Sequence, residues 1–211
     1  MTNRAVSNED PNERLRTVTV RVFLDTQYSN QATPKLLSFG LSSEAGQCFY
    51  TTLTEGWSEA DCSDFVKTEV IPHLGYGVSQ KTTPGEAADR FLVWLDDAFT
   101  AAVVARTGSA RVPIEFKKVL EIISLHTLDK DLVANLPGFS TKAKNLTFKV
   151  RHRTIASLVR DGLNLDDVLH GIEMFFPPGE TPLVRHHALN GALALSYAVK
   201  RTELKAAGEM D

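Results

Sequence analysis

Two short stretches, far apart in the chain, carry residue types that could do chemistry. The first is Asp25-Thr26-Gln27, which follows an alternating run of β-branched residues. A carboxylate at the end of a first strand is where α/β sites are usually built, and it is a candidate metal ligand. The second is His186-His187, at the start of an alanine-rich stretch. Taken alone, each stretch also has a purely structural interpretation. The acid could be a turn residue, and the histidines could cap a helix or lie on the surface.

Three strands are predicted to position the first stretch. Val18 to Leu24 alternate with polar residues at a period of two, which is typical of a strand. The residues 36–41 and 47–52 predict a second and a third strand, after turn signals at Thr33-Pro34 and Ala45-Gly46. Short connections between strands indicate an antiparallel meander.

Helical patterns follow the meander. Thr83-Pro84-Gly85-Glu86 opens a helix, with proline early and glutamate in the first turn. The apolar run 100–105 predicts a buried strand, and 113–125 predicts a helix with one apolar face. A last helix is predicted over 186–205. Strands first, then helices around at least one more strand, predict an α/β three-layer domain.

The composition bounds the class of protein. The chain has 211 residues, 43% of them hydrophobic, and a net charge of −3, which argues against a nucleic-acid binder that uses its whole surface. No apolar run reaches the roughly 20 residues of a membrane span. Two cysteines outside any CxxC pattern favour a cytoplasmic protein. We expect a disordered tail over 1–16, one domain over 17–205 and a flexible tail over 206–211.

In this order, the two stretches resemble the DEDDh 3′–5′ exonucleases, whose fold is RNase H-like. That family has a first strand ending Asp-x-Glu and a last helix beginning His-x-Ala-Leu-x-Asp-Ala, matched here by 25–27 and 186–192. The strand around Leu37 to Gly40, the strand with Tyr50 and the stretch 57–74 are similar to the bacterial and phage branch that degrades RNA. The resemblance spans about 19–197, and it implies an RNase H-like mixed sheet that starts with the meander.

The resemblance implies two divalent metal ions, held by four acidic residues, and a histidine as general base. Asp25 matches the first acid and His186 the general base. Gln27 replaces the second acid, and Gly191 replaces the last one. Asp25 is therefore at best a weak metal ligand, and we expect no cofactor.

The remaining acid of the family should follow the predicted strand at 100–105. No acid lies within 106–112, and Asp96 and Asp97 come earlier, inside a predicted helix, as the alternative. Arg106 or Arg111 in the site would repel a metal ion and could replace its charge or contact a phosphate.

A basic segment offers a possible binding surface. The residues 140–160 contain no acid, whereas 161–180 contain acids and no lysine or arginine. Basic side chains beside an aromatic suit phosphate contact and base stacking. The alternative is a solvated helix face that pairs with the acidic stretch. The candidate nucleic-acid contacts in this segment are Lys142, Lys144, Lys149, Arg151 and Arg153.

Two functions stay open from the sequence. The first is a catalytically impaired exonuclease-like protein that acts by binding single-stranded RNA or DNA, or a protein partner. A regulator or inhibitor of mobile-element origin fits this hypothesis, and a homodimer is compatible with it. The second is an active 3′–5′ exonuclease that uses Mg²⁺ or Mn²⁺ in a rearranged or single-metal site.

Overall fold

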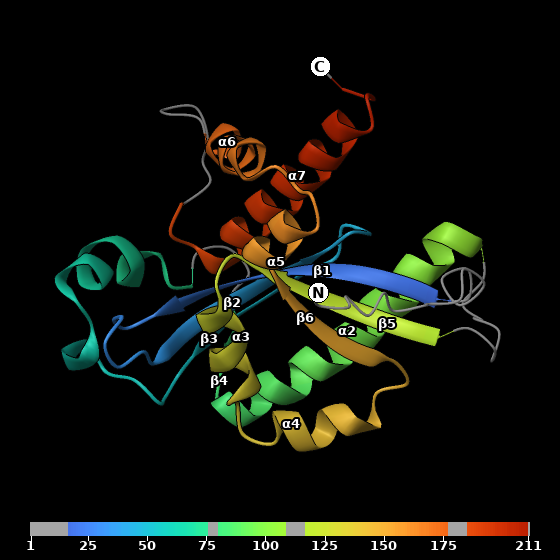
Figure 1. Cartoon of the computed structure of the whole chain (residues 1–211). Helices are drawn as coiled ribbons and strands as arrows, with labels where there is room; N and C mark the ends of the chain where they lie inside the picture. The colour runs from blue at the N-terminus through green and yellow to red at the C-terminus, as the bar shows by residue number, and fades with distance from the viewer. Residues whose placement is uncertain (1–16, 76–79, 109–116, 177–184, 211) are drawn as a thin grey trace, which may run out of the picture.

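One mixed sheet forms the centre of the molecule. The computed structural model describes residues 17–75, 80–108, 117–176 and 185–210. Six strands are arranged in the order β4-β3-β2-β1-β5-β6 (Figure 1). Their bounds are β1 Thr17–Tyr28, β2 Leu36–Ser43, β3 Cys48–Leu53, β4 Gln80–Thr82, β5 Lys117–Ser124 and β6 Lys149–Thr154. The predicted tail over 1–16 lies outside the described residues.

The strand directions place several strand ends at one edge of the sheet. β1, β2 and β3 are antiparallel neighbours, so the predicted meander is confirmed. β5 runs parallel to β1, and β6 runs parallel to β5. The carboxyl ends of β1, β5 and β6 therefore meet at the same edge, where α/β proteins build their sites.

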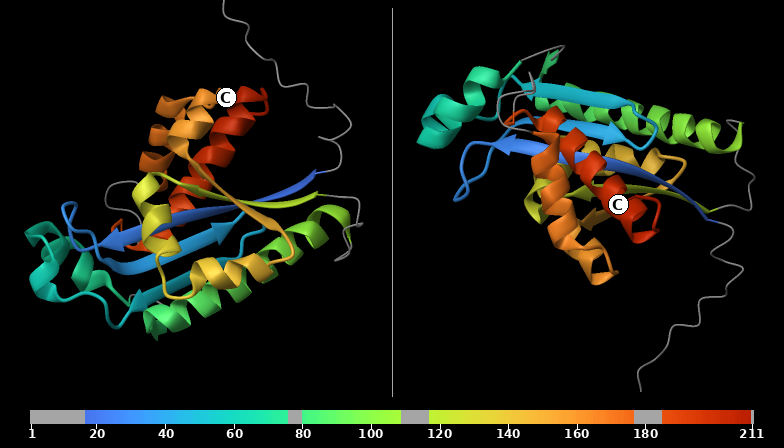
Figure 2. Two further views of the ribbon diagram at one scale, coloured as in Figure 1. Left: turned by 60° about the horizontal axis from the view of Figure 1, so that its bottom comes forward. Right: turned by 90° about the horizontal axis from the view of Figure 1, so that it is seen from above.

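Helices cover both faces of this sheet (Figures 1 and 2). On one face lie α2 and α4, and on the other lie α5, α6 and α7. The described helices are α2 Pro84–Thr107, α3 Thr127–Ala134, α4 Phe139–Lys142, α5 Ile155–Arg160, α6 Leu165–Phe175 and α7 Ala188–Ala206. Short helical turns at Glu59–Asp61, Val66–Val70, Ile71–His73 and Ala143–Asn145 complete the connections. The predicted α/β three-layer, RNase H-like fold class is confirmed.

The helix α2 corrects one prediction. The run 100–105, predicted as a strand, is the last part of this 24-residue helix. As predicted, Thr83 caps the start, where its hydroxyl accepts the backbone N–H of Glu86. Because Ala102 and Val103 continue the helix's buried face, the apolar run belongs to the helical period. The helix ends at Gly108, which adopts a left-handed φ of 69°.

The strand β5 corrects the next prediction. Residues 117–124, predicted as part of a helix, form a strand between β1 and β6. Leu120 and Ile122 pack toward α2, whereas Ile123 packs toward α7. A strand that is buried on both faces has a nearly continuous apolar sequence, and periodicity cannot tell it from a buried helix.

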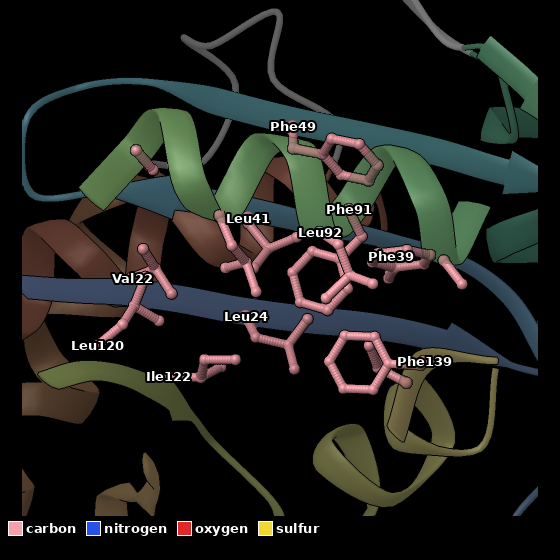
Figure 3. Close-up of a cluster of buried hydrophobic side chains, with 14 of the residues drawn as sticks. Val22, Leu24, Phe39, Leu41, Phe49, Phe91, Leu92, Leu120, Ile122 and Phe139 are labelled. Atoms are coloured by element: carbon pink, nitrogen blue, oxygen red, sulfur yellow. The ribbon is translucent and has the colours of Figure 1, made fainter. Parts of the chain in front are cut away.

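The main core lies between the sheet and α2 (Figure 3). Phe39, Phe49 and Phe91 form its aromatic centre, with ring centroids 5.4–6.2 Å apart. A smaller core on the other face joins Phe23 and Ile123 to α7. The two cores fix the sheet between its helical layers.

The first turn of α7 sits directly on β2. A Cβ atom added at Gly40 would lie 2.4 Å from the Cα atom of Leu189. Gly40 is also the residue opposite Asp25 in the pairing of β1 with β2. The contact therefore sets the start of α7 over the end of β1. Within the described ranges, none of the helices has both the length and the apolar character to cross a membrane.

Candidate functional site

The two motifs from opposite ends of the sequence meet in one cavity. Asp25, Gln27, His186 and Gly191 all line a space of about 220 Å³ at the carboxyl edge of the sheet, together with Arg185. The remaining lining is apolar and comes from Leu125, Ile172, Phe176, Ala194 and Leu195. The fold thus brings together every residue that the resemblance placed in the remnant site.

Asp25 is a poorly solvated carboxylate. Its burial raises its pKa well above the ordinary aspartate value, and the nearby charge of Asp129 raises it further. The side-chain amide of Gln27 donates a hydrogen bond to Asp25 Oδ2 at 3.2 Å, which only partly offsets these effects. At position 27, where the resembled family has an acid, this chain therefore has an N–H donor that faces Asp25.

Gly191 leaves no room for the last acid of the family. A Cβ atom built there would lie 2.2 Å from Asp25 Oδ2 and 2.7 Å from its carboxyl carbon. Separations below 3.0 Å require one of the two groups to move. Asp25 therefore occupies the space in which an aspartate at position 191 would begin.

Asp129 is the acid that the sequence interpretation missed. It is buried on α3, shortly after the end of β5, and accepts the Thr26 hydroxyl at 2.6 Å on one oxygen. Its other oxygen accepts the backbone N–H of His126 at 3.1 Å. Burial raises the pKa of Asp129, although these two donors counteract it.

Asp129 escapes prediction because the sequence pattern indicates the wrong buried strand. The buried strand is β5 rather than 100–105, so the relevant acid follows Ser124 and not Ala105. Asp96 and Asp97, the alternatives, are exposed on α2, which covers the opposite face of the sheet. One sequence signal could have identified Asp129. It is an acid in the first turn of a helix, and that helix follows a run of β-branched residues.

His186 lies between the cavity and an exposed aromatic ring. The Phe65 ring meets it edge-on, with centroids 5.1 Å apart, and remains 55% exposed. Burial lowers the pKa of His186, and the positive charges of Arg185 and His73 act in the same direction against Glu69. The imidazole is therefore neutral at pH 7 and can accept a proton.

Arg185 is the cation at the cavity. Its guanidinium forms an ion pair with Glu173 of α6. It also lies over the Phe176 ring, 5.7 Å from the centroid. The arginine is exposed, so it can contact a ligand that reaches the mouth of the cavity.

Arg106, one of the two arginines considered for the site, lies near the other end of β1 and not at the Asp25 cavity. It donates to the backbone carbonyl of Thr19 and forms an ion pair with Glu44. Thr19 is six residues before Asp25, which corresponds to roughly 20 Å along a strand. Arg111 lies outside the described residues.

The basic segment is spread over several elements. Lys142 forms an ion pair with Asp89 of α2, and Lys144 is exposed on the turn after α4. The other three, Lys149, Arg151 and Arg153, alternate along β6, the last strand of the sheet.

Both arginines of β6 already have acidic partners. Arg151 lies 3.3 Å from Glu121, and Arg153 forms an ion pair with Asp161. The second pair joins the basic segment to the acidic stretch, as the alternative interpretation expected. Lys142, Arg151 and Arg153 therefore each have an acidic partner, and nucleic-acid binding by this segment stays a prediction.

The donor set does not fit the two-metal site that the resemblance implies. Mg²⁺ prefers several carboxylate oxygens. Asp25 is faced by an amide N–H and by the Gly191 backbone, and both oxygens of Asp129 already accept hydrogen bonds. Over the described ranges, no three acid, histidine or cysteine side chains are grouped to hold a metal ion.

The fold and the cavity define the class of protein as an RNase H-like α/β domain with a carboxylate cavity at the edge of its sheet. No protein-family model matches the chain, and no curated protein sequence matches it. The resemblance to DEDDh exonucleases therefore rests on the motifs around Asp25 and His186.

Proposed function

We propose that this protein is a catalytically impaired DEDDh exonuclease-like protein that binds the end of a single-stranded nucleic acid and does not hydrolyse it by a two-metal mechanism. One observation carries the proposal. Asp25, which matches the first acid of the resembled family, faces an amide donor at Gln27 and a glycine at position 191, where that family has two further acids. The protein would act as a regulator that occupies or protects strand ends.

Electrostatics support the loss of hydrolysis. Two divalent ions bring four positive charges, which need several ionised ligands at close range. Burial and Asp129 both favour the protonated form of Asp25, as its raised pKa indicates. A protonated acid beside an N–H donor is a poor ligand for a hard cation.

The surroundings of the cavity support binding. A neutralised Asp25 repels a phosphate less than an ionised one. Arg185 supplies a positive charge at the mouth, and the exposed Phe65 ring beside His186 offers a surface on which a base can stack. Base–aromatic stacking contributes about 1–3 kcal/mol per base.

The test compares binding with cleavage. Labelled single-stranded RNA and DNA oligonucleotides are titrated with the protein in EDTA, Mg²⁺ and Mn²⁺. We expect the same affinity in all three and intact oligonucleotides. Phe65→Ala should weaken binding about tenfold, because one stacking contact is lost. Val93→Ala, which truncates an exposed apolar side chain on α2, is the matched control and should bind normally.

Two outcomes would contradict the proposal. Robust metal-dependent cleavage that disappears in Asp25→Ala would show an active exonuclease. Absence of binding to any oligonucleotide at low salt would leave a protein partner as the better hypothesis.

Asp129 favours one alternative, an exonuclease with a single-metal site. Asp129 lies close enough to Asp25 for its charge to raise the pKa of that acid, and a neutral His186 could serve as general base. Calorimetric titration with Mn²⁺ separates the two functions. A specific site that is lost in Asp25→Ala favours the alternative, and no specific site favours the binding protein.

A further inference from the structure

A second cavity, of about 490 Å³, lies near the other end of β1, and we propose that it binds a small molecule that carries a planar ring and one phosphate or carboxylate group. It lies between α7, the β2–β3 hairpin, the last turns of α2 and the end of α6. Its volume is in the range of small-molecule sites. This inference does not depend on the proposed function at the Asp25 cavity.

One part of the cavity is apolar and aromatic. Phe23 of β1 lines it as a buried side chain, and Leu193 of α7 adds an aliphatic surface. Phe175 and Tyr197 also line it, with ring centroids 6.0 Å apart, and Tyr197 remains 41% exposed. Two aromatic side chains at one cavity can pack against a flat ring.

The charged groups of the cavity carry an excess positive charge. Of the residues that the structure describes, Arg21, Arg106 and Lys200 line it, together with one acid, Glu44. Glu44 is paired with both arginines, and Arg21 is paired in addition with Glu203. Two acids thus offset two of the three cations. Lys200 has no ion pair within the described parts of the chain. Its positive charge could therefore pair with one anionic group of a ligand.

Hydroxyl groups add polar contacts between the two parts. Ser42 and Ser43 are buried, and Ser196 lies one helical turn before Lys200 on α7. The Ser43 hydroxyl oxygen accepts the backbone N–H of Gln47 at 3.0 Å, and its own proton can be donated elsewhere. A few placed polar groups in an apolar cavity are typical of a specific ligand site.

The two cavities are separate. Their described linings have no residue in common, and each is lined by its own set of α7 residues. Between Gly191 at the first cavity and Lys200 at the second, α7 rises by about 14 Å. Variants of one cavity should therefore leave the other unchanged.

AMP and indole-3-acetate serve as probes, because each combines a planar ring with one anionic group. Binding to the full chain is measured by saturation-transfer NMR and calorimetry. We expect saturable binding of at least one probe, and the tighter one identifies the preferred anion. Adenosine lacks the phosphate of AMP, and ribose 5-phosphate lacks its planar base. Each should bind at least tenfold more weakly than AMP if AMP is the tighter probe.

Variants locate the site. Lys200→Glu removes the excess charge from an exposed helix position, and Ser196→Trp fills the cavity. Each should weaken probe binding at least tenfold. Lys81→Glu makes the same charge change at an exposed residue of β4 and should bind normally. If Ser196→Trp fails to fold, which circular dichroism will detect, the exposed Lys200→Glu still decides.

The inference is overturned by three outcomes. The first is that neither probe binds at millimolar concentration. The second is that Lys200→Glu binds the probe as tightly as the unmodified chain does. The third is binding that is lost in His186→Ala but kept in Lys200→Glu, which would place the probe in the first cavity. The His186→Ala comparison distinguishes this third outcome, binding of AMP at the proposed strand-end site, from failure of the second cavity to bind any probe.

Discussion

The two ends of β1 present opposite electrostatic environments on the same face of the sheet. Arg21 and Asp25 are four residues apart on this strand and point to the same side. Around Arg21, both arginines lie against acids, Arg21 against Glu44 and Glu203 and Arg106 against Glu44. Around Asp25, a second acid lies nearby and the neighbouring partners are neutral donors.

The pKa shifts express this difference. Burial acts to lower the pKa of Arg21, but Glu203 and Glu44 outweigh it and the pKa is raised, so the charged form is stabilised. Burial and Asp129 both raise the pKa of Asp25, so its charged form is destabilised. The Arg21 end thus contributes to folding, whereas the Asp25 end keeps an unfavourable arrangement. Such arrangements are expected at functional sites.

The largest effect should come from the glycine beneath α7. Gly40→Ala places a methyl group 2.4 Å from backbone atoms of Leu189, and backbone cannot rotate away. We expect a loss of about 3–4 kcal/mol in the free energy of unfolding, measured by urea denaturation. Gly85→Ala is the control, because nothing lies within 4 Å of its added methyl group and it should be nearly neutral. A small effect at Gly40 would mean that α7 is not fixed over the Asp25 end.

Gly191→Ala tests the contact with Asp25. The added methyl group meets a side chain, which can move, so we expect a smaller loss of about 2 kcal/mol. In an Asp25→Ala background the clash is absent, and the same change should stabilise the helix by up to about 1 kcal/mol. The measurement is a double-mutant cycle on urea denaturation. Equal effects in both backgrounds would contradict the close approach of Asp25 to Gly191.

The sequence predicted the Asp25 end better than the Arg21 end. Alternation over Val18 to Leu24 is a local pattern, and it placed β1 correctly, although the strand continues beyond Asp25 to Tyr28. The start of α7 was identifiable because its motif is also local. The cavity at Arg21 depends on contacts among α2, the β2–β3 hairpin and α7, and no local pattern encodes such contacts.

The errors share one physical cause. A strand buried on both faces has no alternation, so β5 resembled a helix and 100–105, the end of a long helix, resembled a strand. Because the third acid was sought relative to that strand, Asp129 was missed. Its carboxylate is recognised only through contacts with Thr26 and His126, and the first of these joins segments more than 100 residues apart.

Glu44→Gln tests the ion pairs at the Arg21 end of β1. The substitution removes the shared partner of Arg21 and Arg106, although Arg21 keeps Glu203. We expect a loss of about 1–2 kcal/mol in the free energy of unfolding at low salt, and a smaller loss at 1 M NaCl because salt screens the pairs. Glu55→Gln, in an exposed turn, should have no effect. If the loss does not depend on salt, charge pairing is not what stabilises this end.

Asp25→Asn should produce the smallest change, and with the opposite sign. The raised pKa means that the folded state holds the Asp25 proton more tightly than the unfolded chain does. The contribution of Asp25 to stability is therefore fully present below pH 3.8 and is lost as the pH rises toward the folded-state pKa. Asparagine resembles the protonated acid and can still accept the hydrogen bond from Gln27. At pH 7 the variant should be about 1 kcal/mol more stable than the unmodified chain.

The pH dependence distinguishes this explanation from a general packing effect. Urea denaturation at pH 3.5 should give similar stabilities for Asp25→Asn and the unmodified chain, and the difference should grow as the pH rises. Asp97→Asn, on the exposed face of α2, should show no such growth. If Asp25→Asn is instead destabilising at pH 7, Asp25 is ionised and favourably held. The Asp25 end would then resemble the Arg21 end, and a cation at Asp25 would become the better explanation of the site.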